Sequence, residues 1–201
     1  NDVIPTAMHC AYYVDTAEKL MPAMDLLIDT IAKKIAQYHG VVKTGRTHLM
    51  DAMPLTIDQE LGAWNTQLLN ARASLITVLD ALRFLPQGGT AVGTGINAHP
   101  RFAREFCKAI SPLVGFKAET SNDYFRNLSS QDLSVQLSGE LKNLAVILMK
   151  ISNDLRWMNS GPLAGIAEVE LQALQPGSSI MPGKVNPVIP EAVAMAGADV
   201  I

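Results

Sequence analysis

Apolar residues between positions 57 and 85 recur at alternating intervals of four and three. This heptad pattern is typical of a helix that packs lengthwise against another helix, so it predicts one long helix here. Thr56 and Gln59 have the spacing of a capping box at its start, and Pro86 with the glycines that follow predicts its end. The repeating positions are Ile57, Leu61, Trp64, Leu68, Ala71, Leu75, Val78, Leu82 and Leu85.

Two further long helices are indicated by the same kind of pattern. One extends from Leu133 to Met158, and Gly161 with Pro162 predicts its end. The other runs from about Pro5 to Gly40. Pro22 predicts a kink inside this helix, because proline has no N–H to donate to the preceding turn.

Shorter helices are predicted over residues 101–110 and from near Pro187 or Pro190, where a proline suits the first turn. No strand pattern competes with these helices. The stretches 41–55 and 159–189 are therefore predicted to be polar loops, and the fold class is predicted to be all-α.

The lengths of the three long helices determine the expected architecture. Each would be roughly 45–55 Å long, whereas a compact chain of this size has a radius of gyration of about 16–17 Å. We therefore expect residues 1–201 to form one domain, an elongated bundle of long antiparallel helices. Residues 144–149 are apolar on every side of their helix, so they need partners, and copies of the same chain can supply them. This predicts a homo-oligomer with a shared helical core.

Composition excludes two kinds of partner and supports the oligomer. The net charge is −3 and no run of like charge stands out, which argues against nucleic acid. No apolar run approaches the ~20 residues needed to cross a bilayer. Charged residues make up only 17%, which favours burial against other copies of the chain. Cys10 and Cys107 fit no metal spacing, so we expect free thiols in a reducing compartment.

The stretch GSSIMPGKVNP, residues 177–187, carries the strongest chemical pattern. Lys184 and Asn186 place a cation and an amide just before a helix start, where backbone N–H groups add positive potential suited to a carboxylate or phosphate. The alternative is a solvated lysine with Asn186 as a helix cap. Ser178 can be a nucleophile or base only if its alkoxide is stabilised, and otherwise Ser178 and Ser179 are turn hydroxyls.

A second group of candidates lies outside this stretch. His48 follows Thr47 in the polar loop 41–55 and can move protons near neutral pH, or it is an ordinary loop side chain. Glu191 lies in the first turn of the last helix, where a carboxylate also simply complements the helix dipole. These residues indicate an anion-binding loop and acid–base groups, but they do not define a reaction. A helical binding module would have the same features.

Four segments of the chain resemble the fumarase/aspartase superfamily: GSSIMPGKVNP, TGRTHLMDAMPLT, NDVIPTAMH and GGTAVGTGINAHP. The first is similar to the family pattern GSSxMPxKxNP, and the resemblance spans all 201 residues. Gly183 and His48 are similar to class II fumarases, whereas aspartases more often have Ala and Gln at these positions. The resemblance implies a lyase that reversibly hydrates fumarate to malate, with aspartase, or a non-catalytic oligomeric scaffold, as the alternatives.

The resemblance also implies the setting of this reaction. It implies a homotetramer whose active sites are shared between subunits, a small dicarboxylate substrate, and no metal or organic cofactor. It implies an enzyme of the tricarboxylic acid cycle that is cytoplasmic, or mitochondrial in a eukaryotic source. The chain starts at Asn1 and lacks the N-terminal and C-terminal domains of the family, so we expect residues 1–201 to be the central helical domain of a longer enzyme.

The residues that match the family motif acquire roles by this resemblance. Ser178 would remove the C3 proton of malate, and the carbanion would spread its charge into the adjacent carboxylate as an aci-carboxylate. Lys184 and Asn186 would hold that carboxylate where negative charge grows, with assistance from Ser179 and the Val185 backbone.

The other matching residues would act at the hydroxyl and at the carboxylates. His48 would act on the hydroxyl side, through or beside a water, with Glu191 polarising it. Thr47 and Asn1 would hydrogen-bond the substrate's carboxylates. One departure stands out: the chain has Asp58-Gln59-Glu60 where the family pattern is usually GQE. The extra carboxylate either weakens anion binding or caps the helix.

Overall fold

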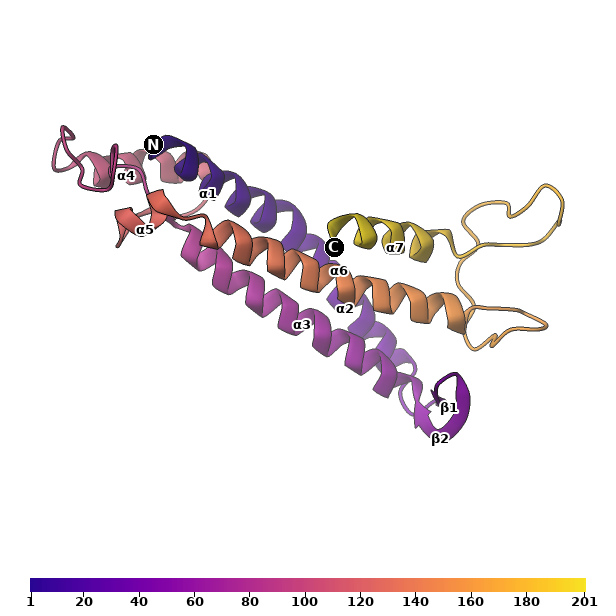
Figure 1. Ribbon diagram of the computed structural model, residues 1–201. Coiled ribbons are helices and arrows are strands. Elements are labelled where there is room, and N and C mark those ends of the chain that lie inside the picture. Colours follow the sequence, from indigo (N-terminus) through magenta and orange to yellow (C-terminus); the bar gives the residue numbers. More distant parts are fainter. The chain divides into compact units, whose positions relative to one another are not determined.

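The computed structural model describes all 201 residues, and they form two compact units, Asn1–Glu140 and Leu141–Ile201 (Figure 1). Helices dominate both units, which confirms the all-α class. The helix α6, Asp132–Met158, contributes its first turns to one unit and the rest to the other. None of the helices combines the length and apolarity that a membrane span requires.

The first unit begins with a long helical run that is interrupted only by one π-helical segment. It consists of α1 (Val3–Asp15), the π-helix η1 (Thr16–Leu20) and α2 (Met21–Gln37). The π segment ends where the Met21 N–H bonds to the Thr16 carbonyl. The kink is predicted at Pro22, and the structure has a π-helical turn, a feature that can bend a helix, just N-terminal to Met21 and Pro22.

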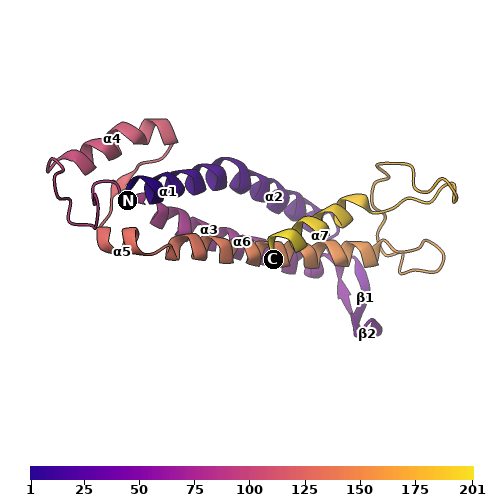
Figure 2. The same ribbon diagram turned by 45° about the horizontal axis from the view of Figure 1, so that its top comes forward.

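The helix α3, Ile57–Leu82, returns antiparallel to α2 and lies beside it (Figures 1 and 2). The predicted capping box is present, and the Thr56 N–H donates to Gln59 Oε1 at 3.0 Å. The Arg72 guanidinium joins the two helices by donating to both carboxylate oxygens of Asp25. The predicted heptad stripe is the core of this pair, with Leu68, Leu75, Val78 and Leu82 all 0% exposed.

The prediction of a polar loop over 41–55 is wrong, because this stretch forms a β-hairpin. The strands β1 (Val42–Thr47) and β2 (Met50–Thr56) pair antiparallel, with Val42 opposite Thr56 and Thr47 opposite Met50. Most of the strand residues are exposed, so no alternation of apolar and polar residues marks the strands. The two-residue turn has positive φ at His48 and Leu49, which lack the usual Asn-Gly signal of such turns.

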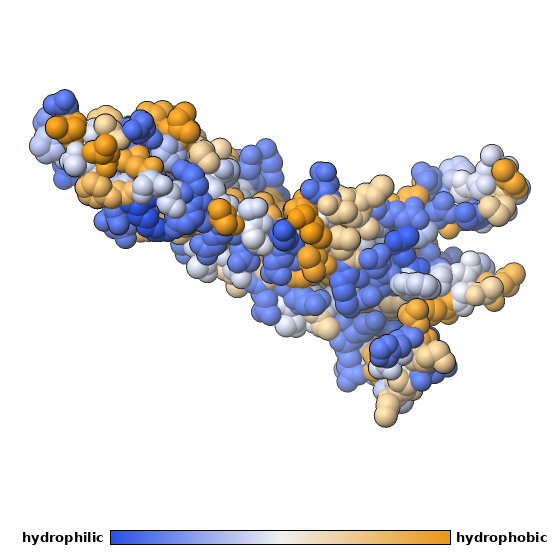
Figure 3. Space-filling model, in the orientation of Figure 1, coloured by the Kyte–Doolittle hydropathy of each residue, from blue (hydrophilic) through white to orange (hydrophobic).

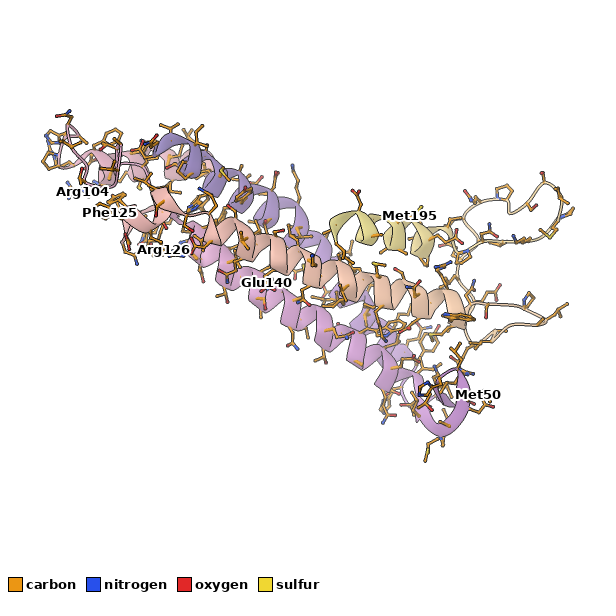
Figure 4. All side chains as sticks on the ribbon, viewed as in Figure 1. Met50, Arg104, Phe125, Arg126, Glu140 and Met195 are labelled. Atoms are coloured by element: carbon orange, nitrogen blue, oxygen red, sulfur yellow. The ribbon has the colours of Figure 1, made fainter.

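Exposed apolar side chains gather on this hairpin. Met50 and Met53 are 71% and 79% exposed, and Leu49 at the turn is 63% exposed. Figure 3 shows orange and tan atoms at the hairpin, and Figure 4 labels Met50 there. The hairpin therefore presents apolar as well as polar side chains to its surroundings.

The rest of the first unit packs a smaller core at the other end of α1. The two-residue strands β3 (Phe84–Leu85) and β4 (Glu119–Thr120) pair parallel, and α4 (Phe102–Val114) and α5 (Tyr124–Ser129) flank them. The core comprises Leu85, Cys107, Phe116 and Ala118. Both cysteines are free thiols, as predicted, and burial raises the pKa of each.

The second unit consists of the later part of α6, an irregular connection and α7 (Val188–Val200). Residues 159–187 form neither helix nor strand, as predicted. A Cβ atom added to Gly197 of α7 would lie 2.5 Å from Met149 Cγ of α6, so the absence of a side chain lets these helices approach closely. Val146, in the apolar stretch of α6, is 50% exposed.

Candidate functional site

The β1–β2 hairpin places Thr47 and His48 at its tip. Thr47 is the last residue of β1 and pairs with Met50, and His48 is the first residue of the turn, with φ of 53°. Both side chains are exposed. The His48 ring is therefore open to solvent in the single chain.

The base of the hairpin is tied to the start of α3 by Asp58. Its carboxylate accepts the Gly40 N–H at 3.2 Å and lies 3.0 Å from His39 Nδ1. A hydrogen bond from the Thr56 hydroxyl is the main cause that lowers the pKa of Asp58, and the His39 and Gly40 contacts act in the same direction. Asp58 thus serves the helix start, which is one of the two roles that its departure from the family pattern suggested.

Asn1 lies at the opposite end of the α1–η1–α2 run from the hairpin (Figure 1). Its Nδ2 donates to the Ala91 carbonyl at 2.6 Å. Residues 3–37 separate Asn1 from the turn before β1, which amounts to roughly 50 Å of helix. A single chain therefore does not bring Asn1 together with Thr47 and His48.

The GSSIMPGKVNP stretch closes on itself within the second unit. The Gly177 backbone lies directly against the Lys184 carbonyl, so no side chain fits at position 177. The Lys184 N–H bonds to the Met181 carbonyl at 3.2 Å, and Ser178 Oγ accepts the Ile180 N–H at 3.1 Å. In this conformation Ser178 acts as a turn hydroxyl, which was the alternative to a catalytic role. Ser179 is exposed.

A cavity of about 1010 Å³ lies in the second unit beside the N-terminus of α7. Four of the predicted site residues line it: Lys184, Val185, Asn186 and Glu191. The ammonium group of Lys184, the amide of Asn186 and the N–H groups of the first turn of α7 make this region suited to an anion. Ser178 and Ser179 are not among the lining residues.

Sequence reasoning missed three charged residues that line the same cavity: Arg156, Glu168 and Glu170. Arg156 lies in the last turn of α6 and donates to Asn153 Oδ1 at 3.0 Å. Its position at the C-terminus of a long helix suits the helix dipole, so the sequence offered a simpler explanation for it. No three His, Cys, Asp or Glu side chains lie close enough to hold a metal ion.

Residues 1–201 match the model of a protein family that is described as lyase (Lyase_1). The chain therefore belongs to this lyase family. It is 57% identical over 201 residues to fumarate hydratase class II 2 of Pseudomonas aeruginosa, covering 100% of this chain and 44% of that protein. It is 46% identical over 201 residues to the class II fumarate hydratase of Bacillus subtilis, again covering 100% and 44%.

A solved structure gives the same result. The crystal structure of a class II fumarase from Schistosoma mansoni matches with a TM-score of 0.95 at 36% identity, covering 100% of this chain and 45% of that chain. The predicted resemblance to class II fumarases is thus confirmed. The chain spans less than half the length of the relatives that it matches.

Proposed function

We propose that the complete protein is a fumarate hydratase that reversibly hydrates fumarate to malate. The observation that carries this proposal is the cavity beside α7, where Lys184, Asn186 and Glu191 converge in a chain whose relatives are named class II fumarate hydratases. Residues 1–201 would serve as the central helical domain of this enzyme. The reaction would belong to the tricarboxylic acid cycle of the cytoplasm, or of mitochondria in a eukaryotic source.

In the dehydration direction, the Ser178 alkoxide takes the C3 proton of malate. The electron pair left on C3 moves into the adjacent carboxylate, which becomes an aci-carboxylate with two negative charges. Lys184 and Asn186 stabilise this charge, and the Ser179 hydroxyl and the Val185 backbone assist. Serine is a weak base at neutral pH, so the step also requires that Lys184 and the loop amides stabilise the alkoxide.

The hydroxyl then leaves from C2. The electron pair of the aci-carboxylate returns to form the C2–C3 double bond as the C2–O bond breaks. His48, polarised by Glu191 of a neighbouring chain, delivers a proton to the leaving hydroxyl, directly or through a water, so that water and fumarate are the products. Thr47 and Asn1 hydrogen-bond the carboxylates and orient the substrate.

This assignment requires more than one chain. Asn1 and His48 lie at opposite ends of a helical run of roughly 50 Å, whereas a four-carbon dicarboxylate is many times shorter. We therefore propose a homotetramer in which each active site takes residues from different subunits. The half-exposed Val146 on α6 and the exposed Met195 on α7 are apolar surfaces that such an assembly would cover.

The test is to add fumarate to the complete protein and follow the ultraviolet absorbance of its double bond. We expect absorbance to fall as malate accumulates, and to rise when malate is supplied instead. Release of ammonia from aspartate without malate formation would select the aspartase alternative. Turnover of neither substrate by a well-folded oligomer would select the scaffold.

A further inference from the structure

The Asp2 side chain is buried, but it does not cap the helix that it precedes. Asp2 is the N-cap residue of α1, a position at which an aspartate usually accepts an N–H of the first helical turn. No such bond is present. Its Oδ2 instead accepts the N–H groups of Gly88 and Thr90, at 2.9 and 3.0 Å. The carboxylate is therefore committed to the glycine-rich connection 88–100.

This connection has a backbone conformation that depends on its surroundings. Thr90 has φ of 59°, a region that a β-branched residue rarely adopts, so the conformation persists only where neighbouring groups hold it. A Cβ at Gly88 would lie 2.5 Å from Ala103 Cβ of α4, and one at Gly93 would lie 2.9 Å from Phe125 Cδ1 of α5. The two helices hold one side of the connection, and Asp2 holds the other.

The residue after Thr90 contacts Asn1. The Ala91 carbonyl accepts a hydrogen bond from Asn1 Nδ2 at 2.6 Å. A carbonyl can only accept, so this contact determines which end of the Asn1 amide faces the connection. The Oδ1 atom and the second N–H are left for other partners on a side chain that is exposed. Asp2 and Asn1, adjacent in sequence, thus both hydrogen-bond to the same four-residue segment, 88–91.

We propose that Asp2 is a positioning residue for substrate binding and acts through Asn1. By holding the Gly88 and Thr90 N–H groups, it places the Ala91 carbonyl so that the free N–H of the Asn1 amide donates to a substrate carboxylate. This inference rests on the proposed function, in which Asn1 binds the dicarboxylate. Without the Asp2 carboxylate, residues 88–91 become mobile and the Asn1 amide can rotate. Asn1 then no longer has the substrate-binding orientation before the substrate arrives.

The role predicts a particular kinetic effect. In the proposed mechanism Lys184 and Asn186 hold the carboxylate on which charge develops, so we assign Asn1 to the other carboxylate, where its bond is equally strong in the ground state and the transition state. Weakening such a bond raises KM and leaves kcat nearly unchanged. A general loss of folding would instead lower the concentration of active enzyme, and so the apparent kcat.

The experiment compares Asn1→Ala, Asp2→Ala and the double variant in the complete protein, with fumarate as substrate. We expect each single variant to raise KM about tenfold with kcat changed less than threefold. The double variant should be no worse than either single variant, because one residue acts through the other. Asp2→Asn should restore a KM close to wild type, since its amide oxygen can accept both N–H groups.

The controls separate this inference from the proposed function. Thr16→Val removes a buried hydroxyl from the same helical run and should leave KM unchanged. If Asn1→Ala raises KM but Asp2→Ala does not, or if the two effects add fully, the positioning role is wrong and the proposed function stands. If Asn1→Ala leaves KM unchanged, Asn1 does not bind the substrate. Its own assigned role and the positioning role of Asp2 are then both wrong. Should Asp2→Ala not fold, Asp2→Glu, which moves the carboxylate by one methylene, must raise KM in the same direction.

Discussion

The Asp58 carboxylate lies 3.0 Å from Nδ1 of His39 and also accepts the Gly40 N–H, so one side chain joins the end of α2 to the start of α3. The hairpin that carries His48 connects α2 to α3 and begins and ends at this junction. The Ile57 N–H bonds to the Val41 carbonyl at 2.9 Å, and Lys43 forms an ion pair with Glu60. The direction in which the hairpin projects therefore depends on contacts at its base.

Asp58→Asn should loosen this base in a pH-dependent way. The pKa of Asp58 is lowered from its ordinary value of 3.8, chiefly by the Thr56 hydroxyl. A lowered carboxylate pKa contributes stability above the ordinary pKa, and this contribution is lost as pH falls through the folded value. Urea unfolding should show wild type more stable than Asp58→Asn at pH 7, with the difference shrinking as the pH is lowered below the ordinary pKa of 3.8. An equal difference at both pH values would show that the charge is not responsible.

His9 should make the first unit sensitive to mild acid. The ring is 4% exposed and lies 3.2 Å from the Phe84 carbonyl, and burial lowers its pKa below the ordinary 6.5. The unfolded chain then binds a proton more readily than the folded one, so stability is lost as pH falls below 6.5 toward the folded pKa. Urea unfolding at pH 7.5 and 5 should show a larger loss for wild type than for His9→Gln. A parallel loss in both would assign the effect to other groups.

Leu68→Ala should be strongly destabilising, because the side chain is 0% exposed in the stripe between α3 and its neighbours. Deleting a fully buried leucine and leaving a cavity costs about 2–5 kcal/mol in free energy of unfolding. The adjacent Leu69 is 46% exposed and provides a matched control. Leu69→Ala should change stability by less than about 1 kcal/mol, measured by the same denaturant titration.

Lys184→Ala in the complete protein should lower kcat/KM for fumarate roughly 10²–10³-fold, the range expected when a group that stabilises a developing anion is removed. Lys142→Ala is the control, because Lys142 is an exposed lysine of α6 that does not line the cavity. Circular dichroism should show both variants folded. Retention of most activity in Lys184→Ala would remove the lysine from the proposed mechanism.

Mixing two inactive variants tests whether the active site is shared between chains. If a site takes His48 and Ser178 from different subunits, reassembling equal amounts of His48→Ala and Ser178→Ala gives both native residues in roughly a quarter of the sites. Activity should then return to about that fraction of wild type. Ser178→Ala mixed with Lys184→Ala is the control, because both residues belong to one closed loop and should give no recovery. Absence of recovery in the first mixture would place His48 and Ser178 in one chain.

The long helices and their buried faces could be predicted from the sequence, because their signals are local. The interval between Leu61, Trp64 and Leu68 follows from the helical repeat, and the Thr56–Gln59 capping box needs only four residues. The glycines, prolines and polar residues of 177–187 likewise indicated an irregular segment, which the structure has. The anion site expected from Lys184 and Asn186 stays a prediction, and the structure shows that both residues line one cavity.

Only the tertiary structure decided the hairpin over 42–56, the separation of Asn1 from His48, and the place of Arg156 in the cavity. Most residues of the hairpin are exposed and its two-residue turn has no glycine, so no periodic or turn signal marks it. The partners of the Asp2 carboxylate could not be predicted from the sequence either. An aspartate before a helix predicts a helix cap, but its hydrogen-bond partners lie 86 and 88 residues away. A sequence records which groups are available, whereas the pairing of groups across a fold is determined by packing that joins distant segments.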